Sequence, residues 1–220
     1  MQTIVVNSQK GGSGKSSLCR VLSVQAAEDG HSAFLIDLDT QGTVNKWHAK
    51  RAAEEPRRVE LPPDAPVAVL NQALGLLAKQ AANYVFIDTP PHASGVLDDV
   101  FALADLVLVP VKPTPDDLEA AAVTVGRLRA LGVPFLFVVT QAIVNTNITA
   151  QAIAALSHHG PVAESIMVNR VVYPASFTDG RAPQEIDRKG QAATEIAKLW
   201  VNIQTCLHAS MKSERKVANG

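Results

Sequence analysis

The sequence has few cysteines, and they form no pattern that would bind a metal or build a disulfide framework. The 220 residues include two cysteines, Cys19 and Cys206, far apart and without a C-x-x-C pair. A zinc site, an iron–sulfur cluster and a disulfide scaffold are therefore not expected. The pair His158-His159 is a weak metal-binding candidate, and a solvated pair at a helix end is the simpler interpretation.

The sequence also lacks long apolar runs and a large net charge. No run approaches the ~20 residues of a membrane span, and the N-terminus lacks the pattern of a signal peptide, so we expect a cytoplasmic protein with no membrane partner. The net charge is -1, so contact with nucleic acid would need a local basic patch. Hydrophobic residues make up 47% of the chain, which provides a sizeable core.

Short apolar segments alternate with segments of helical length. The apolar segments are unbroken, as is typical of strands covered on both faces of a parallel sheet; they are Thr3–Val6, Ala33–Ile36, Tyr84–Ile87, Leu106–Val111 and Pro134–Val139. Helices are predicted over Ser16–Asp29, Val67–Ala82, Asp116–Leu131 and Gln191–His208.

This alternation predicts the α/β fold class: a single domain with a mostly parallel, twisted sheet flanked by helices on both faces. We place the domain at residues 1–209 and expect residues 210–220 to form a polar, disordered tail. Residues 51–66 are the least regular stretch, and we expect a surface excursion with one short strand there.

A glycine-rich segment, QKGGSGKSS at residues 9–17, lies between the first predicted strand and the first predicted helix. This is the context of a phosphate-binding loop, in which backbone N–H groups and a helix N-terminus surround a polyphosphate. Lys15 would neutralise the β- and γ-phosphates, and the Ser16 hydroxyl would bind Mg²⁺. The residues assigned to the nucleotide here are Gly11, Gly12, Ser13, Gly14, Lys15, Ser16 and Ser17.

The loop departs from the usual pattern G-x-x-x-x-G-K-[ST] in two ways. Gln9 stands where that pattern has its first glycine, and Lys10 adds a second lysine. The departure raises three possibilities: a damaged phosphate loop, a chance cluster of glycines, or a loop with an added task for Lys10.

Three aspartates follow predicted strands. Asp88 comes directly after Tyr84–Ile87, at the strand end where ligands bind in open α/β sheets, and it could hold Mg²⁺ through water. Asp37 and Asp39 are two positions apart, so both point to one side if the strand continues. The simpler alternative for either one is that it caps the following helix.

Together these segments resemble the ParA/MinD family of deviant-Walker-A P-loop ATPases. The family pattern K-G-G-x-G-K-[ST] corresponds to residues 10–16, D-x-D-x-Q to residues 37–41 and D-[TS]-P-P to residues 88–91. An apolar strand ending in a proline matches ADLVLVPVKPTPDDL at residues 104–118. The resemblance covers roughly residues 2–200.

The resemblance implies a Mg²⁺-dependent ATPase that forms a homodimer with ATP sandwiched at the interface. Lys10 would reach the phosphates of the ATP bound to the other subunit and act like an arginine finger. Lys15 would bind its own ATP, and Asp39 would orient the attacking water. Asp37 would lie in the outer magnesium shell, and Ser16 and Asp88 complete the predicted metal set.

The resemblance places the adenine contacts late in the chain. Arg170 and Pro174, within MVNRVVYPAS, are the candidates. Gln141 stands where family members often have asparagine or arginine.

The resemblance points to DNA partition, by a small ParF-like or Soj-like protein. Such a protein binds DNA non-specifically as the ATP dimer, is nucleoid-associated in that state, and is released by a ParB-like or ribbon-helix-helix partner. The chain starts at the first strand, without the helix-turn-helix extension of larger partition ATPases. The alternative is a MinD-like or organelle-positioning regulator without DNA binding. A membrane helix like that of MinD is not expected, because the end ASMKSERKVANG is too polar.

Contact with DNA would need clustered lysines and arginines. We favour Arg188 and Lys189. They belong to one of four basic clusters, and each cluster also fits a solvated helix face or loop: Lys46/Lys50/Arg51, Arg57/Arg58, Arg127/Arg129 and Arg181/Arg188/Lys189.

Overall fold

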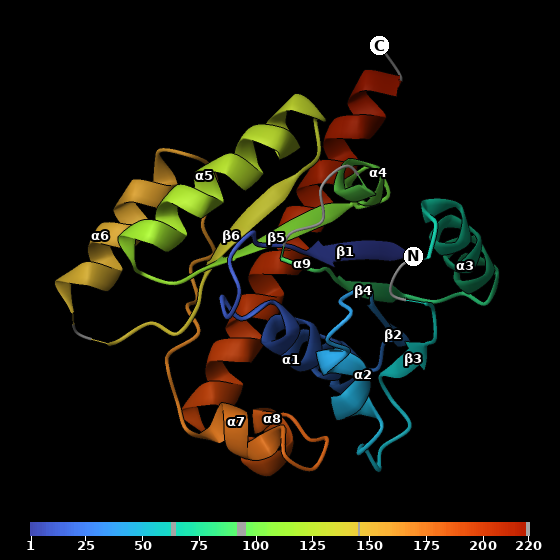
Figure 1. Ribbon diagram of the computed structural model, residues 1–220, viewed down its shortest axis with the longest axis horizontal. Helices are drawn as coiled ribbons and strands as arrows, with labels where there is room; N and C mark the ends of the chain where they lie inside the picture. Colours follow the sequence, from blue (N-terminus) through green and yellow to red (C-terminus); the bar gives the residue numbers. More distant parts are fainter. Residues whose placement is uncertain (63–64, 92–95, 145, 219–220) are drawn as a thin grey trace.

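The computed structural model describes residues 1–62, 65–91, 96–144 and 146–218. In these ranges the chain forms a six-stranded sheet with the order β3-β2-β4-β1-β5-β6 (Figure 1). All the strand pairs are parallel, which confirms the predicted fold class. The strands are β1 Gln2–Val6, β2 Ala33–Asp37, β3 Arg57–Val59, β4 Tyr84–Asp88, β5 Leu106–Val111 and β6 Phe135–Val139.

Helices cover both faces of the sheet, and successive strand residues face opposite layers. Ile4 and Val6 belong to the cluster beneath α1 and α9, whereas Val5 belongs to the cluster beneath α3, α4, α5 and α6. The helices are α1 Lys15–Glu28, α2 Thr43–His48, α3 Val67–Lys79, α4 Val96–Phe101, α5 Pro115–Ala130, α6 Asn147–Ser157, α7 Val172–Ser176, α8 Pro183–Ile186 and α9 Gln191–Ala218.

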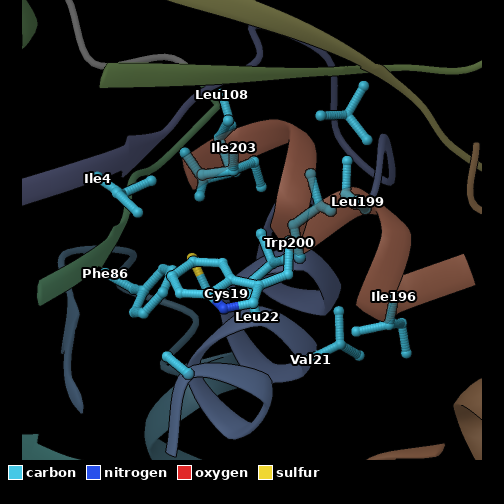
Figure 2. Packing of buried hydrophobic residues seen from close by; sticks show 14 of the residues in the cluster. Ile4, Cys19, Val21, Leu22, Phe86, Leu108, Ile196, Leu199, Trp200 and Ile203 are labelled. Carbon is cyan, nitrogen blue, oxygen red and sulfur yellow. The ribbon is translucent and has the colours of Figure 1, made fainter. Parts of the chain in front are cut away.

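Helix α9 anchors the layer that carries α1. Its apolar residues Ile196, Leu199, Trp200 and Ile203 recur at helical spacing and are at most 1% exposed. The ring centroids of Trp200 and Tyr84 lie 4.8 Å apart in an edge-on arrangement. Trp200 also lies near Phe86 and Cys19 (Figure 2). This packing fixes α1, whose N-terminus follows directly on the glycine-rich loop.

The expectation of a disordered tail from residue 210 differs from the structure, because α9 continues to Ala218. The last described apolar contact of α9 is Leu207. The segment that follows is rich in lysine, glutamate and arginine, which are good helix formers. The expected strand in residues 51–66 is present as β3.

The periodicity of the sequence missed α6, which has 11 residues, and the shorter helices α2, α4, α7 and α8. Each of the shorter four has four to six residues, which is too short for an apolar repeat to stand out. In the described ranges, no helix has the length and apolar character that crossing a membrane requires.

Candidate nucleotide-binding site

The predicted site residues meet at one edge of the sheet, where the parallel strands end. In the strand register Val6 is paired with Asp88, and Asp88 with Asp37. The glycine-rich loop follows β1, Lys112 follows β5 and Thr140 follows β6. The fold therefore brings together segments that are more than 100 residues apart in the chain.

The glycine-rich loop is held from outside by the segment after β6. Thr140 Oγ1 donates a hydrogen bond to the Ser13 carbonyl at 2.6 Å, and Gln141 Nε2 donates one to the Gly12 carbonyl at 2.7 Å. Gly12 and Gly14 have φ angles of 73° and 100°, a region that favours glycine. Gln141, which departs from the residue types expected for an adenine contact, thus fixes the shape of the loop. The sequence alone gave no signal for this role.

Ser16 and Asp88 form the centre expected for Mg²⁺. Ser16 Oγ donates a hydrogen bond to Asp88 Oδ2 at 2.6 Å, and burial raises the pKa of Asp88 to about 7. The buried oxygens Asp88 Oδ1 and Asn7 Oδ1 have no hydrogen-bond partner among the described residues. Unsatisfied oxygens of this kind fit a hydrated cation.

The protein supplies few ligands for such a cation. Within the described part of the chain, no group of three or more histidine, cysteine, aspartate or glutamate side chains could hold a metal. Mg²⁺ typically keeps several waters and binds through one or two protein groups plus substrate phosphates. The residues present therefore fit Mg²⁺ that enters with a nucleotide.

Asp37 caps helix α2. Its Oδ2 accepts the N–H groups of Val44 and Asn45, both at 2.9 Å, and its Oδ1 accepts the N–H of Asp39 at 3.1 Å. The contacts of Asp37 thus match the helix-capping alternative. Gly42, at the start of α2, has no side chain that could cap the helix, and Asp37 takes this role. Both carboxylate oxygens are engaged, so a metal role for Asp37 would run through water.

Lys15 lies beside the acidic residues. Its ammonium donates a hydrogen bond to the Lys10 carbonyl at 3.3 Å, and burial lowers its pKa while Asp88 and Asp39 oppose that shift. Asp39 is half-buried, and its Oδ1 accepts the N–H of Gln41 at 2.9 Å. A nucleotide phosphate would offer Lys15 an acceptor stronger than a neutral carbonyl.

Lys10 does not extend freely from the loop. Its Nζ lies 3.0 Å from Asp116 Oδ2 and 3.6 Å from Asp117 Oδ2, at the start of α5. The Asp117 side chain is 5% exposed, and its Oδ2 accepts a hydrogen bond from Thr114 Oγ1 at 2.6 Å. The sequence identified this acidic pair only as a helix start and missed the contact with Lys10.

A cavity of about 200 Å³ adjoins the loop at the place expected for the adenine base. Its lining includes Gly14, Ser17, Tyr173, Pro174 and Phe177. Arg170 also borders it, but the Arg170 guanidinium is engaged by Glu195 and Gln191 of α9. Pro174 and Ser17 therefore line this cavity, while the charged end of Arg170 is tied to α9.

Arg188 and Lys189 lie in the connection between α8 and α9. Both side chains are exposed, and Arg188 borders a second cavity, lined by Glu28 and Arg51 among others. The structure does not bring them to the loop.

This arrangement, a glycine-rich loop between β1 and α1 that faces a buried aspartate on a neighbouring parallel strand, defines a P-loop nucleotide-binding fold. A family model described as the CobQ/CobB/MinD/ParA nucleotide binding domain matches residues 4–204. The chain belongs to this family.

Two curated relatives extend over most of the chain. Protein ParA of Rhizobium radiobacter is 25% identical over 189 residues, which span 82% of this chain and 84% of that protein. The maintenance of carboxysome distribution protein A of Halothiobacillus neapolitanus is 24% identical over 201 residues, or 88% and 91% of the two chains.

Solved structures share the fold. MinD in the MinC:MinD complex of Aquifex aeolicus superposes with a TM-score of 0.77 at 17% identity, over 93% of this chain and 96% of that chain. MinD of Pyrococcus horikoshii complexed with Mg-ADP gives a TM-score of 0.77 at 14% identity, over 95% and 98%.

Proposed function

We propose that this protein is an ATP-dependent dimerising switch ATPase for plasmid or chromosome partition. ATP and Mg²⁺ bind at the loop, the ATP-bound chain dimerises, and the dimer binds DNA non-specifically. A ParB-like or ribbon-helix-helix partner then stimulates hydrolysis and releases the dimer. The observation that carries the nucleotide part is the pairing of Ser16 with buried Asp88 beside a loop whose glycines are locked in shape.

Each residue of the site has a task in this proposal. Lys15 neutralises the phosphates of the bound ATP, and the loop N–H groups hold them in place. Asp39, half-buried beside Lys15, orients the attacking water. Bound Mg²⁺ would neutralise charge that develops on the phosphates, with Ser16 as a ligand and Asp88 holding its water.

Lys10 links hydrolysis to dimerisation. In this structure its ammonium faces Asp116 and Asp117 of its own chain. To act on the ATP of a second subunit, Lys10 must leave this acidic pair. Asp116 is 82% exposed, so its hold on Lys10 is weak, and the phosphates of a partner's ATP can compete with it.

The proposed cargo is inferred from the similarity to curated relatives. Similarity to protein ParA supports DNA partition, and the sequence contributes basic residues such as Arg188 and Lys189. A second candidate, positioning of a protein assembly, is favoured by the similarity to a carboxysome distribution protein over 88% of the chain. In both cases the protein would be cytoplasmic, and nucleoid association in the ATP state would follow from binding to DNA.

An ATP-dependent shift of non-specific DNA tests the partition function. We expect a DNA duplex to be shifted at low salt with ATP and Mg²⁺, and to be released with ADP or at high salt. Asp39→Ala, which should trap the ATP dimer, serves as the strongly binding control, and Lys15→Ala serves as the non-binding one. Nucleotide binding and ATP-dependent dimerisation without any DNA shift would contradict partition and favour the second candidate.

A further inference from the structure

Three lysines surround the glycine-rich loop, and two of them have partners. Lys15 donates to the Lys10 carbonyl, and Lys10 is paired with Asp116 and Asp117. Lys112 is half-buried, and its ammonium makes no hydrogen bond or ion pair with any residue that the structure describes. A half-buried cation without an anion, at the edge of a polyphosphate site, is a candidate ligand for that polyphosphate.

The backbone of Lys112 is fixed. It follows Val111, the last residue of β5, and its carbonyl accepts the N–H of Thr114 at 2.8 Å. The next residue, Pro113, is buried. Because β5 pairs directly with β1, the residue that follows β5 emerges beside the loop that follows β1.

The side chain of Lys112 reaches over the loop. Its Nζ lies 3.5 Å from the position that a Cβ on Gly12 would occupy. Gly12 lies in the middle of the loop, and its N–H is among those expected to surround the phosphates. The ammonium of Lys112 therefore lies next to Gly12 of the loop, whereas that of Lys10 is paired with Asp116 and Asp117 at the start of α5.

We propose that Lys112 is a third phosphate-binding lysine, which contacts the β- or γ-phosphate of the nucleotide bound to its own chain. The inference rests on the proposed nucleotide binding at the loop. In this proposal the three lysines have different roles. Lys15 and Lys112 bind the nucleotide of their own subunit, and Lys10 contacts the nucleotide of the second subunit.

The test compares ATP and ADP affinity in variants of Lys112. Lys112→Met keeps the length of the side chain and removes the charge, and Lys112→Arg restores the charge. Lys79→Met, on the exposed surface of α3, is the matched control. Titrations with fluorescent ATP and ADP at protein concentrations that keep the chain monomeric give the dissociation constants, and the melting temperature without nucleotide reports folding.

We expect Lys112→Met to weaken ATP binding by about 10-fold or more, the order of a lost hydrogen bond between charged groups. Lys112→Arg should remain within about threefold of the wild type. The melting temperature should not change, and ATP affinity should depend less on salt in Lys112→Met. A larger loss for ATP than for ADP would assign the contact to the γ-phosphate, and equal losses would assign it to the β-phosphate.

Several outcomes would overturn the inference while the proposed function survives. One is wild-type affinity in Lys112→Met when Lys15→Ala no longer binds. Another is a loss that occurs only at concentrations where dimers form, which would place Lys112 against the other subunit's nucleotide. A loss that Lys112→Arg does not restore would also contradict a role for its charge. If Lys15→Ala itself binds ATP like the wild type, the proposed function fails.

Discussion

Two cavities of the molecule differ in the kind of polar groups that line or adjoin them. The smaller one, about 200 Å³, adjoins the glycine-rich loop. The larger one, about 690 Å³, lies among the end of α1, the segment after α2 and the residues around α8. Size alone would favour the larger cavity as a binding site.

The charges of the larger cavity are largely paired with one another. The Arg51 guanidinium is 3% exposed and makes two hydrogen bonds with Glu185, at 2.6 and 2.8 Å, and others with the carbonyls of Glu55 and Gly180. Arg181 is paired with Asp179. These contacts pair most of the charges and join distant parts of the chain, and Glu55 Oε2 is the buried lining atom that has no hydrogen-bond partner among the described residues.

Around the loop, more buried groups lack a partner among the described residues: Asp88 Oδ1, Asn7 Oδ1 and Ser13 Oγ. Buried groups that lack a partner cost free energy, so their presence points to a missing ligand. The comparison indicates that the smaller cavity and its loop bind a ligand, and that the larger cavity is a structural junction. Four variants test this contrast, in order of decreasing expected effect.

The largest effect is expected from Arg51→Ala. The change leaves Glu185 and two carbonyls without their partner and should lower the free energy of unfolding by about 3–5 kcal/mol. Urea unfolding followed by circular dichroism measures the change. ATP affinity, measured where the variant is folded, should stay at the wild-type value. Arg57→Ala, at an exposed ion pair, is the control and should change stability by less than about 1 kcal/mol.

Lys15→Ala should have the second largest effect and the opposite pattern. Removing the buried ammonium should weaken ATP binding by about 100-fold or more, because the charge-assisted hydrogen bonds between Lys15 and the phosphates are lost. Stability without nucleotide should remain close to that of the wild type. Isothermal titration with Mg-ATP gives the affinity. If Arg181→Ala, in the larger cavity, matched this loss, the assignment of the two cavities would be wrong.

Gln141→Ala should have an intermediate effect. The loop loses one of its two outside hydrogen bonds, so ATP affinity should fall by about 2- to 10-fold. Gln151→Ala, at an exposed position of α6, provides the matched control for the same titration. Unchanged affinity in Gln141→Ala would mean that Thr140 alone holds the loop.

The smallest effect is expected from Asp116→Asn. The exposed carboxylate contributes less than about 1 kcal/mol to holding Lys10. Its loss should therefore lower the ATP concentration needed for dimerisation by a few-fold. Analytical ultracentrifugation over a range of ATP concentrations measures this, with Glu119→Gln as the control on the same helix. A higher requirement for ATP would show that Asp116 assists dimerisation.

The sequence was sufficient for the features that depend on local pattern. Unbroken apolar segments predicted five strands of the sheet, and the glycines around Lys15 with Asp88 predicted the centre of the site. The same pattern could not separate two roles of an aspartate: the family resemblance implies an outer-shell magnesium role for Asp37, and in the structure Asp37 caps α2. Short helices such as α7 and α8 lack the length that makes periodicity visible.

The remaining contacts depend on tertiary structure. Gln141 binds the Gly12 carbonyl across 129 positions in the sequence, and Lys10 meets Asp116 across 106. Lys112 reaches the loop only because β5 pairs with β1. Neither hydropathy nor motif spacing predicts these contacts, because they arise from the order of the strands in the sheet.

The central claim is that Lys10 completes the site of a second subunit. Light scattering coupled to size-exclusion chromatography, with ATP, ADP or no nucleotide, tests it on the wild type, on Lys10→Ala and on Lys10→Gln. We expect the wild type to dimerise with ATP only. The Lys10 variants should bind ATP in titrations, and they should either remain monomeric or form dimers that hydrolyse ATP no faster than the monomer. Lys10 variants that dimerise and hydrolyse ATP like the wild type would contradict it.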